Sequence, residues 1–202
     1  VGKMKPKIAV IGAGIAGIHC CSELIELGYH VDLYEKSNEI GGRMKTDLID
    51  GFQIDHGFHV LQTGYEFTQK VIDYDKLDAK AFEPGALVIR SSTKRNRIWR
   101  LSDPFRRPFS SFKDAFGFFA SPIDMFKVLL MRRKLTKMSV DEIFLKGDLT
   151  TEHWLRNQGF SQKFINRFFY PLFSGIFLES ELRTNERLFK FVFRTMSKGD
   201  MV

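Results

Sequence analysis

The fold of this chain is decided by one run near its amino terminus, Val10-Ile11-Gly12-Ala13-Gly14-Ile15-Ala16-Gly17. The apolar residues 8–11 favour a buried β-strand that leads into three glycines. A helical pattern follows at once, with apolar residues on one side: Ile15, Ile18, Leu24, Ile25 and Leu27. Gly28 is placed to end that helix, and a second apolar strand over residues 31–34 ends at Glu35.

Strand, glycine turn, helix, strand and acid in this order predict a dinucleotide-binding βαβ unit. Gly12 permits a tight turn, Gly14 lets the backbone approach a pyrophosphate, and Gly17 lets helix and strand pack closely. The free N–H groups at the helix start would face the phosphates. Glu35 would accept hydrogen bonds from ribose hydroxyls and repel a 2′-phosphate. We therefore predict cofactor contacts from Gly12, Ala13, Gly14, Ile15, Ala16, Gly17, Glu35 and Lys36. A glycine turn in an unrelated α/β protein is the alternative, and five agreeing features argue against it.

Composition places the chain among globular proteins. It has 202 residues, of which 44% are hydrophobic and 27% charged, enough to bury a core. No apolar run approaches the roughly 20 residues of a membrane-spanning helix. The basic residues 1–7 lack the separate apolar region of a signal peptide. Adjacent Cys20 and Cys21 cannot bridge without strain, which indicates reduced thiols. We therefore expect a cytoplasmic or peripheral membrane location.

Positive charge is concentrated in one Phe-rich stretch. Residues 1–60 hold 6 Lys+Arg and 8 Asp+Glu, whereas residues 91–137 hold 12 and 3. Such a patch suggests an anionic surface as partner. In one interpretation, residues 105–137 form an in-plane amphipathic pair that docks on an anionic membrane. In the other, which we favour, the Phe stripe is core and the charges are solvated. No nucleic-acid-binding module is recognised, so we expect no nucleic acid as partner.

A second glycine element follows the acid. The polar loop after Glu35 ends in Gly41-Gly42-Arg43, where paired glycines allow another close backbone approach and Arg43 can pair with a phosphate. A domain that binds only NAD has no need of this element. The segment from Gly12 to Arg43 resembles the FAD-binding amino terminus of the amine oxidase, phytoene desaturase and protoporphyrinogen oxidase superfamily. The resemblance implies FAD as cofactor, with Gly41, Gly42 and Arg43 at its phosphates or at the flavin edge.

Residues 47–55 predict a β-hairpin with Asp50-Gly51 as its turn. The pattern Phe-x-Ile-Asp-x-Gly at residues 52–57 resembles the family segment beside the flavin ring. This implies an anchoring role for Asp55 and backbone contacts from Gly57, Phe58 and His59. His56 and His59 invite an acid/base role. We favour hydrogen bonding near the cofactor, because in flavoenzymes the cofactor carries the redox step. No catalytic residue is assigned, and no residues fall at metal-ligand spacings.

The remaining chain predicts a short helix, a β-hairpin and then a series of helices. The short helix spans Tyr65–Tyr74 and the hairpin runs from Phe82 to Leu101. Ser110 or Ser111 can cap a helix that carries Phe112, Phe116 and Phe119. Further helices are expected from Pro122, after a capping box at Ser139, over 151–158 and over 185–196. Residues 159–161 and 171–178 also resemble the substrate-side helices of the desaturase-like branch.

The sequence as a whole predicts an α/β fold. A Rossmann-type FAD/NAD(P)-binding βαβ unit occupies residues 1–62, and a mixed, mainly helical substrate-domain portion occupies residues 63–202. The resemblance implies an FAD-dependent oxidoreductase that takes hydride from a C–N or C–C bond of a small apolar substrate. Enzymes of this superfamily are considerably longer, so we expect a truncated chain whose flavin site needs a partner chain or a missing carboxy-terminal half.

Two other functions stay open. The first is a non-catalytic membrane-associated or interaction protein that keeps the nucleotide-binding scaffold. The second is an NAD-dependent enzyme, against which the element at Gly41, Gly42 and Arg43 argues, and fold alone does not decide function.

Overall fold

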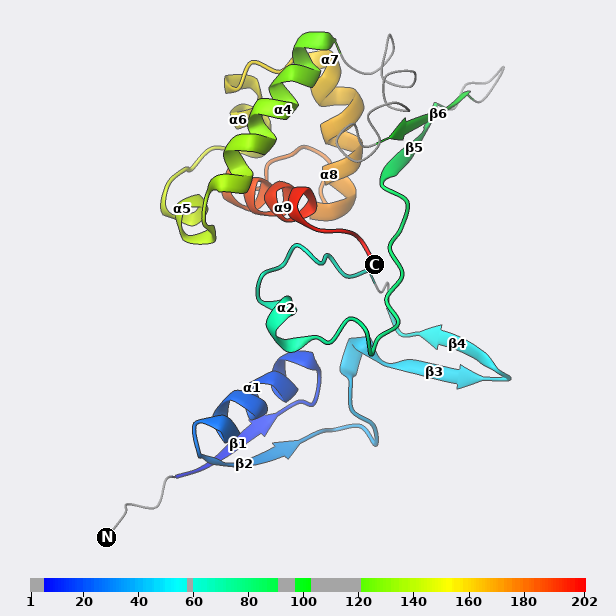
Figure 1. Ribbon diagram of the computed structural model, residues 1–202, viewed down its shortest axis with the longest axis vertical. Helices are drawn as coiled ribbons and strands as arrows, with labels where there is room; N and C mark the ends of the chain where they lie inside the picture. The colour runs from blue at the N-terminus through cyan, green and yellow to red at the C-terminus, as the bar shows by residue number, and fades with distance from the viewer. Residues whose placement is uncertain (1–5, 58–59, 91–96, 103–120) are drawn as a thin grey trace. The chain divides into compact units, whose positions relative to one another are not determined.

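The computed structural model describes residues 6–57, 60–90, 97–102 and 121–202 (Figure 1). The chain divides into two compact units, Val1–Val60 and Leu61–Val202. The first unit is α/β and the second is mainly helical, which confirms the expected fold class. The functional roles expected for residues 1–62 and 63–202 stay predictions.

Two parallel strands and one helix open the first unit. β1 (Lys7–Ile11) pairs in parallel with β2 (His30–Tyr34), from Lys7 opposite His30 to Ile11 opposite Tyr34. α1 (Ile15–Glu26) connects the strands and ends shortly before Gly28. The φ of Gly28 is 79°, a left-handed conformation that glycine adopts without steric cost. The predicted βαβ unit is confirmed.

A short 3-10 helix, η1 (Gly42–Met44), leads into a two-stranded hairpin. β3 (Thr46–Ile49) and β4 (Phe52–Asp55) are antiparallel. The turn residues Asp50 and Gly51 have φ of 52° and 85°. Two successive positive φ angles fit the tight turn that the Asp-Gly pair favours, so the predicted hairpin is confirmed. At its open end, the Thr46 hydroxyl donates a hydrogen bond to the Asp55 carboxylate at 2.5 Å.

The helix predicted over Tyr65–Tyr74 is wrong in extent, because α2 covers only Thr68–Val71. The Thr68 hydroxyl bonds to the Tyr65 carbonyl and to the Tyr74 hydroxyl, at 2.9 and 3.0 Å. Ile72 is extended, and the Asp73 carboxylate accepts a hydrogen bond from the Lys76 backbone N–H at 3.2 Å. Short polar side chains that bond nearby backbone compete with a helix, which is why this one stops after a single turn.

The hairpin predicted between Phe82 and Leu101 is confirmed. β5 (Gly85–Arg90) and β6 (Arg97–Ser102) are antiparallel, with Gly85 opposite Ser102 and Arg90 opposite Arg97.

The rest of the described chain is helical, as expected. The segments are α4 (Pro122–Lys137), α5 (Val140–Leu145), α6 (Thr151–Asn157), α7 (Gln162–Phe164), the π-helical turn η2 (Ile165–Phe169), α8 (Tyr170–Phe177) and α9 (Glu186–Lys198). The capping box at Ser139 and the helix start at Pro122 are confirmed. The helix expected around Phe112, Phe116 and Phe119 lies outside the described residues. Within the described ranges, no helix is both long enough and apolar enough to cross a membrane.

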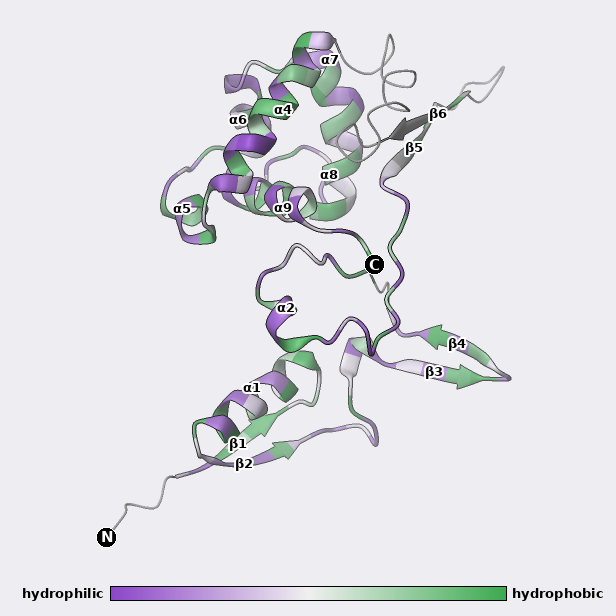
Figure 2. Cartoon of the chain, in the orientation of Figure 1, coloured by the Kyte–Doolittle hydropathy of each residue, from purple (hydrophilic) through white to green (hydrophobic). Residues whose placement is uncertain are grey.

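An aromatic core holds the helical unit. Hydrophobic and hydrophilic residues alternate along its helices, as one buried side per helix requires (Figure 2). Phe169 has no exposed surface, and its ring centroid lies 5.2 Å from those of Phe160 and Phe164 and 5.8 Å from that of Phe189. All three rings meet Phe169 edge-on, the arrangement that aromatic pairs prefer. The buried cluster comprises Met131, Leu135, Trp154, Leu155, Phe160, Phe164, Ile165, Phe169, Phe173, Leu182 and Phe189.

The buried carboxylate of Asp124 binds the N-cap residues of two helices. Asp124, 2% exposed, accepts hydrogen bonds from the Ser121 hydroxyl at 2.7 Å and from the Ser161 backbone N–H and hydroxyl at 2.9 and 2.8 Å. Ser121 and Ser161 are the N-caps of α4 and α7. Burial acts to raise the pKa of Asp124, but the hydrogen bonds from Ser161 and Ser121 outweigh it and hold that pKa below its ordinary value. The start of α4 is thereby fixed to the helical core.

Candidate functional site

The three glycines of the first loop meet three different steric demands. Gly12 has a φ of 99°, and its N–H donates to the Tyr34 carbonyl at 2.7 Å. A Cβ on Gly17 would lie 1.8 Å from the Gly12 carbonyl oxygen, so helix and loop touch there. Gly14 has an ordinary extended backbone, and a Cβ on it would meet nothing within 4 Å. A Cβ on Gly12 would also meet nothing within 4 Å, so Gly12 and Gly14 both border open space. Gly12 needs glycine for its positive φ, and the backbone of Gly14 leaves room beside it for a diphosphate.

The amino terminus of α1 lies at this open space. Gly14 is its N-cap, and no acidic side chain stands in the first turn. The N–H groups at a helix start have no intrahelical acceptor and carry partial positive charge, which favours phosphate. Ile15 and Ala16, both exposed, and Gly17 supply these groups. The predicted contacts at Gly12, Gly14, Ile15, Ala16 and Gly17 are thus gathered on one loop and one helix end.

Glu35 reaches from the end of β2 to the glycine loop. One carboxylate oxygen accepts the Ala13 backbone N–H at 2.7 Å, and the other accepts the N–H and hydroxyl of Ser37 at 2.9 and 3.0 Å. Hydrogen bonds from Ser37 and Ala13 lower the pKa of Glu35 to about 2. The carboxylate is exposed and ionised at neutral pH, so it keeps lone pairs for ribose hydroxyls and negative charge against a 2′-phosphate.

The second glycine element packs backbone to backbone on the first. The Gly41 N–H donates to the Ala13 carbonyl at 2.8 Å, and Gly41 forms a parallel bridge with Gly14. Gly41 and Gly42 have φ of 108° and 57°, and a Cβ on Gly42 would lie 3.3 Å from the Gly14 Cα. Glycine is needed at both positions for conformation, and at Gly42 also for space. The exposed Arg43 follows directly in η1.

Ala13 and Lys36 differ from the other predicted contacts. Ala13 has no exposed surface, and its N–H and carbonyl are bonded to Glu35 and Gly41, so it contributes by joining the two loops. Lys36 is exposed beside Glu35. Among the predicted flavin-side residues, Gly57 lies next to η1, where a Cβ would be 3.4 Å from the Arg43 carbonyl oxygen. Phe58 and His59 lie outside the described residues.

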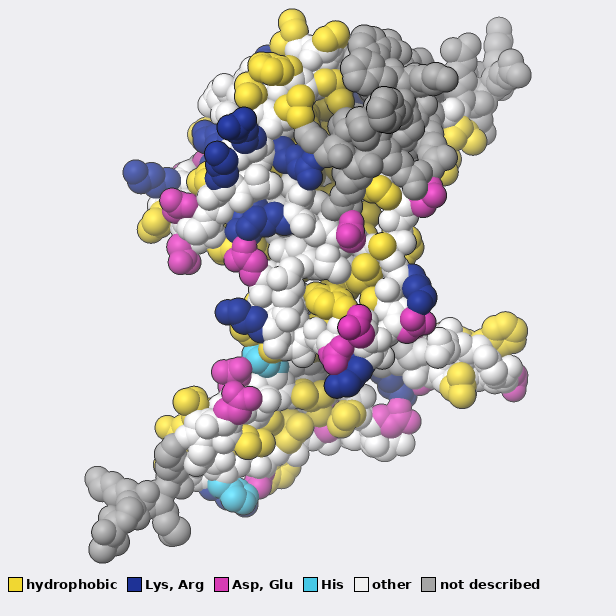
Figure 3. All heavy atoms as spheres, viewed as in Figure 1, with side chains coloured by type: hydrophobic (Ala, Val, Ile, Leu, Met, Phe, Trp, Pro, Cys, Tyr) yellow, Lys and Arg dark blue, Asp and Glu magenta, His cyan; other side chains and the backbone are white. Residues whose placement is uncertain are grey.

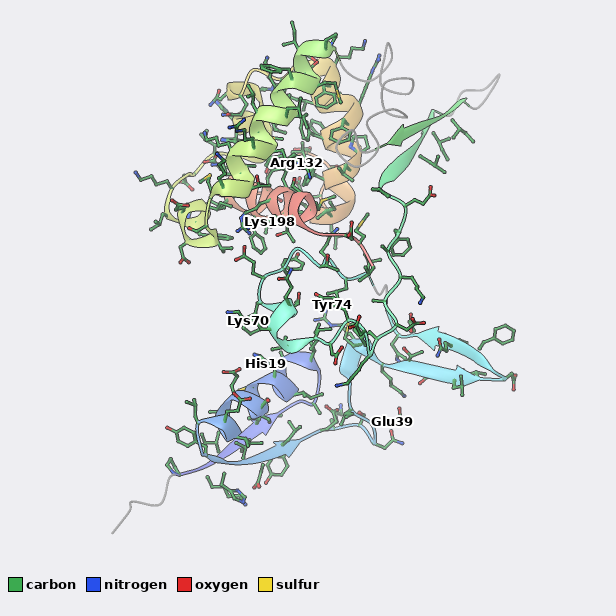
Figure 4. The ribbon with its side chains drawn as sticks, in the orientation of Figure 1. His19, Glu39, Lys70, Tyr74, Arg132 and Lys198 are labelled. Carbon is green, nitrogen blue, oxygen red and sulfur yellow. The ribbon has the colours of Figure 1, made fainter. Side chains whose placement is uncertain are left out.

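A charged cluster borders η1. The Lys45 ammonium pairs with Glu39, which is labelled in Figure 4, at 2.6 Å and with Asp47 at 2.9 Å. The His56 ring nitrogen lies 2.7 Å from Asp47. The hydrogen bonds from Lys45 and His56 lower the pKa of Asp47, and those to Glu39 and Asp47 raise the pKa of Lys45. His56 is therefore hydrogen-bonded, as favoured from the sequence. Within the described ranges, no group of three or more His, Cys, Asp and Glu side chains could hold a metal ion.

Sequence reasoning missed Ser37 and the cluster around Lys45. A serine two residues after Glu35 was an available signal, because a short hydroxyl side chain bonds readily to nearby groups. The pairing of Lys45 with Glu39 and Asp47 carried no such signal, since it depends on how the loop folds back before β3.

The family comparison agrees with this geometry. Residues 10–74 match the NAD(P)-binding Rossmann-like domain. The chain is 40% identical over 73 residues to a 4,4'-diaponeurosporene oxygenase of Staphylococcus aureus strain USA300. That match covers 36% of this chain and 14% of the oxygenase.

Two solved structures share the fold across nearly the whole chain. An oxidoreductase from Methanosarcina mazei has a TM-score of 0.62 at 19% identity, and a protein from Pyrococcus furiosus has a TM-score of 0.56 at 17% identity. Each match covers 98% of this chain and 45% of the other. The chain thus spans less than half of these proteins, and the likeness to them is one of fold. Residues 10–74 thus match the model of the NAD(P)-binding Rossmann-like domain, and the chain shares its fold with part of the Methanosarcina mazei structure.

Proposed function

We propose that this chain binds FAD through residues 12–43 and serves in a flavin-dependent oxidoreductase that takes hydride from a C–N or C–C bond of an apolar substrate. The observation that carries the proposal is the position of Glu35. Its carboxylate reaches the first glycine loop at Ala13, next to the open backbone of Gly14. Acid, glycine loop and helix start therefore converge as a nucleotide diphosphate requires.

The second glycine element favours FAD over a nicotinamide cofactor. An NAD site of the Rossmann type is complete with the first loop, the helix start and the acid. Here Gly41 and Gly42 add a second strip of side-chain-free backbone against Gly14. The exposed Arg43 that follows can meet a phosphate in bidentate fashion.

The residues present would hold the adenosine diphosphate part of the cofactor. The N–H groups at the start of α1 would bind phosphate oxygens, and Glu35 would orient the ribose. FAD, when bound, supplies the acceptor for the hydride, and the protein supplies binding, orientation and electrostatics. We assign no side chain of this chain to proton transfer.

The Phe-rich helical unit supports an apolar substrate class. Aromatic side chains provide large apolar area for contact. The related oxygenase is named for 4,4'-diaponeurosporene, and we extend to this chain only the idea of an apolar substrate. The comparisons give the non-catalytic alternative no support.

The test is a titration of the chain with FAD, followed by flavin absorbance after gel filtration, with ADP as competitor. Gly14→Ala is the diagnostic variant, because its methyl group meets no protein atom within 4 Å but would occupy the side where we propose that the diphosphate binds. We expect it to weaken binding of FAD and ADP about tenfold or more, that is by about 1.4 kcal/mol. Ala is a weaker N-cap than Gly, so the free energy of unfolding should fall by about 0.5–1 kcal/mol, and the far-ultraviolet circular dichroism of the variant should show that it stays folded in the binding assay.

Gly175→Ala is the matched control. A Cβ on Gly175 of α8 also meets nothing within 4 Å, and this residue lies in the helical unit. It should bind FAD as the parent does. The proposal fails if the parent chain binds neither FAD nor ADP, or if Gly14→Ala binds both as well as Gly175→Ala does.

A further inference from the structure

Helix α4 has one side in the core and one side in solvent. Asp124, Met131 and Leu135 are buried, at spacings that place them on one face. The helix is anchored at its start by the Ser121 capping box and by the bonds from Asp124 to Ser161. The outer face is therefore displayed on a rigid element.

The first half of the outer face is apolar. Ile123, Phe126 and Leu130 are 65%, 59% and 52% exposed, and Leu129 is exposed beside them. Residues 123, 126 and 130 follow the spacing of three and four that aligns side chains on one side of a helix. Large apolar side chains that are exposed together mark an interaction site more often than singly scattered ones do.

The second half of the same face is basic. The side chains of Arg133, Lys134 and Lys137 are exposed and, within the described part of the chain, form no ion pair or hydrogen bond. They continue the spacing of Phe126 and Leu130 along the helix. Two other cations of α4 are engaged with the core: Lys127 donates to the Gly159 carbonyl, and Arg132 donates to the Ser197 carbonyl at 3.0 Å. Figure 3 shows hydrophobic side chains toward one end of α4 and Lys and Arg side chains along the other half.

We propose that this outer face of α4 docks the protein on an anionic lipid surface, with Ile123, Phe126 and Leu130 entering the headgroup region and Arg133, Lys134 and Lys137 pairing with lipid phosphates and carboxylates. Exposed apolar side chains that can enter the headgroup region and neighbouring basic side chains that can pair with anionic headgroups both contribute to peripheral binding of a protein to a membrane. This docking surface is independent of nucleotide binding.

The charge pattern favours lipid over other partners. A nucleic acid would use the cations but has no place for the three large apolar side chains. A second copy of α4 facing the first would bring two unpaired basic halves together wherever the helices run parallel, which is repulsive. An anionic bilayer satisfies both halves at once, since its surface attracts the cations and its interior takes the apolar side chains.

Vesicle co-sedimentation of the whole chain tests the proposal, with phosphatidylcholine vesicles that contain or lack phosphatidylserine, at low and high salt. We expect binding only to the vesicles with phosphatidylserine, weakened by salt. The variant R133Q/K134Q/K137Q should bind about a hundredfold more weakly, at about fivefold per charge. The variant I123Q/F126Q/L130Q should lose about tenfold or more, because the apolar contribution is removed.

The matched control is K70Q/K76Q/K80Q, which removes three exposed lysines outside α4 and gives the same net charge as the first variant. It should bind as the parent does. Far-ultraviolet circular dichroism should be unchanged in all variants, because every position is exposed. The proposal is overturned if the parent stays in the supernatant, if the control loses as much binding as R133Q/K134Q/K137Q, or if the parent binds duplex DNA or itself in preference to the vesicles.

Discussion

In the helical unit Phe169, Phe173 and Phe189 have no exposed surface, whereas in the amino-terminal unit Ile11 on β1 is 88% exposed and Tyr34 on β2 is 55% exposed. Both sets of residues are large and apolar, and both lie within regular secondary structure. Only the helical unit places them inside a packed cluster. The two units therefore derive their shape from different interactions.

The amino-terminal unit is shaped by its backbone. Among its described residues, the buried apolar side chains are those of Ala13 and Cys21. Its loops are fixed instead by hydrogen bonds from Gly12 to Tyr34 and from Gly41 to Ala13. A site that must bring phosphate close to the backbone cannot fill that space with side chains, so backbone contacts take the place of packing.

The largest expected effect separates the two kinds of unit directly. Phe169→Ala should lower the free energy of unfolding of the helical unit by about 3–5 kcal/mol, because it removes a buried ring and leaves a cavity. Ile11→Ala should change the free energy of unfolding by about 0.5 kcal/mol or less, because that side chain is already in solvent. Chemical denaturation followed by circular dichroism measures both. Equal losses of unfolding free energy from the two substitutions would show that the two units do not differ in how much they depend on side-chain packing.

The next largest effect tests whether close backbone contact, and not side-chain packing, fixes the structure of the amino-terminal unit. Gly17→Ala places a Cβ 1.8 Å from the Gly12 carbonyl oxygen, so α1 or the loop must move. We expect this substitution to lower the free energy of unfolding of the first unit by about 1–3 kcal/mol, despite the better helix propensity of Ala. Hydrogen exchange at the amides of α1 measures the loss.

Gly14→Ala is the comparison for that experiment, since its methyl group enters open space. It should speed hydrogen exchange in α1 only by the loss of a favourable N-cap, which is less than the effect of the clash in Gly17→Ala, while weakening nucleotide binding. If Gly17→Ala exchanges as slowly as Gly14→Ala does, close contact at Gly17 is not what positions the helix.

Local chemistry explains what the sequence could predict. Gly12, Gly14 and Gly17 follow an apolar strand at fixed spacing, and the structure bears out the tight turn at Gly12 and the close packing at Gly17. Asp50-Gly51 specifies a tight turn by its φ preferences alone, and the capping box at Ser139 specifies a helix start within four residues. In each case the residues that decide the structure are neighbours in the chain.

Contacts between distant residues explain what the sequence could not predict. Asp124 caps α7 through Ser161, 37 positions away, and no local pattern distinguishes it from an ordinary first-turn acid. Glu66 bonds Arg194, which is 3% exposed, at 2.6 Å and Lys198 at 2.8 Å across 128 and 132 positions (Figure 4). The side-chain bonds of Thr68 and Asp73 overrode the apolar spacing that predicted a longer helix.

The smallest expected effect concerns the charge of Glu35, whose carboxylate connects the end of β2 to the glycine loop through a hydrogen bond from Ala13. The pKa of Glu35 is lowered from 4.5 to about 2 by Ser37 and Ala13. Its contribution to stability is therefore fully present above about pH 4.5 and is lost as the pH falls toward 2.

Glu35→Gln cannot ionise, and its amide N–H₂ would face a backbone donor. The parent should accordingly be more stable than Glu35→Gln at neutral pH, and the difference should shrink steadily below pH 4.5. Thermal unfolding of both proteins across this range measures it. Because the carboxylate is exposed, the effect is modest and should weaken with salt. A difference that does not change with pH would mean that Glu35 fixes the loop by shape alone, without its charge.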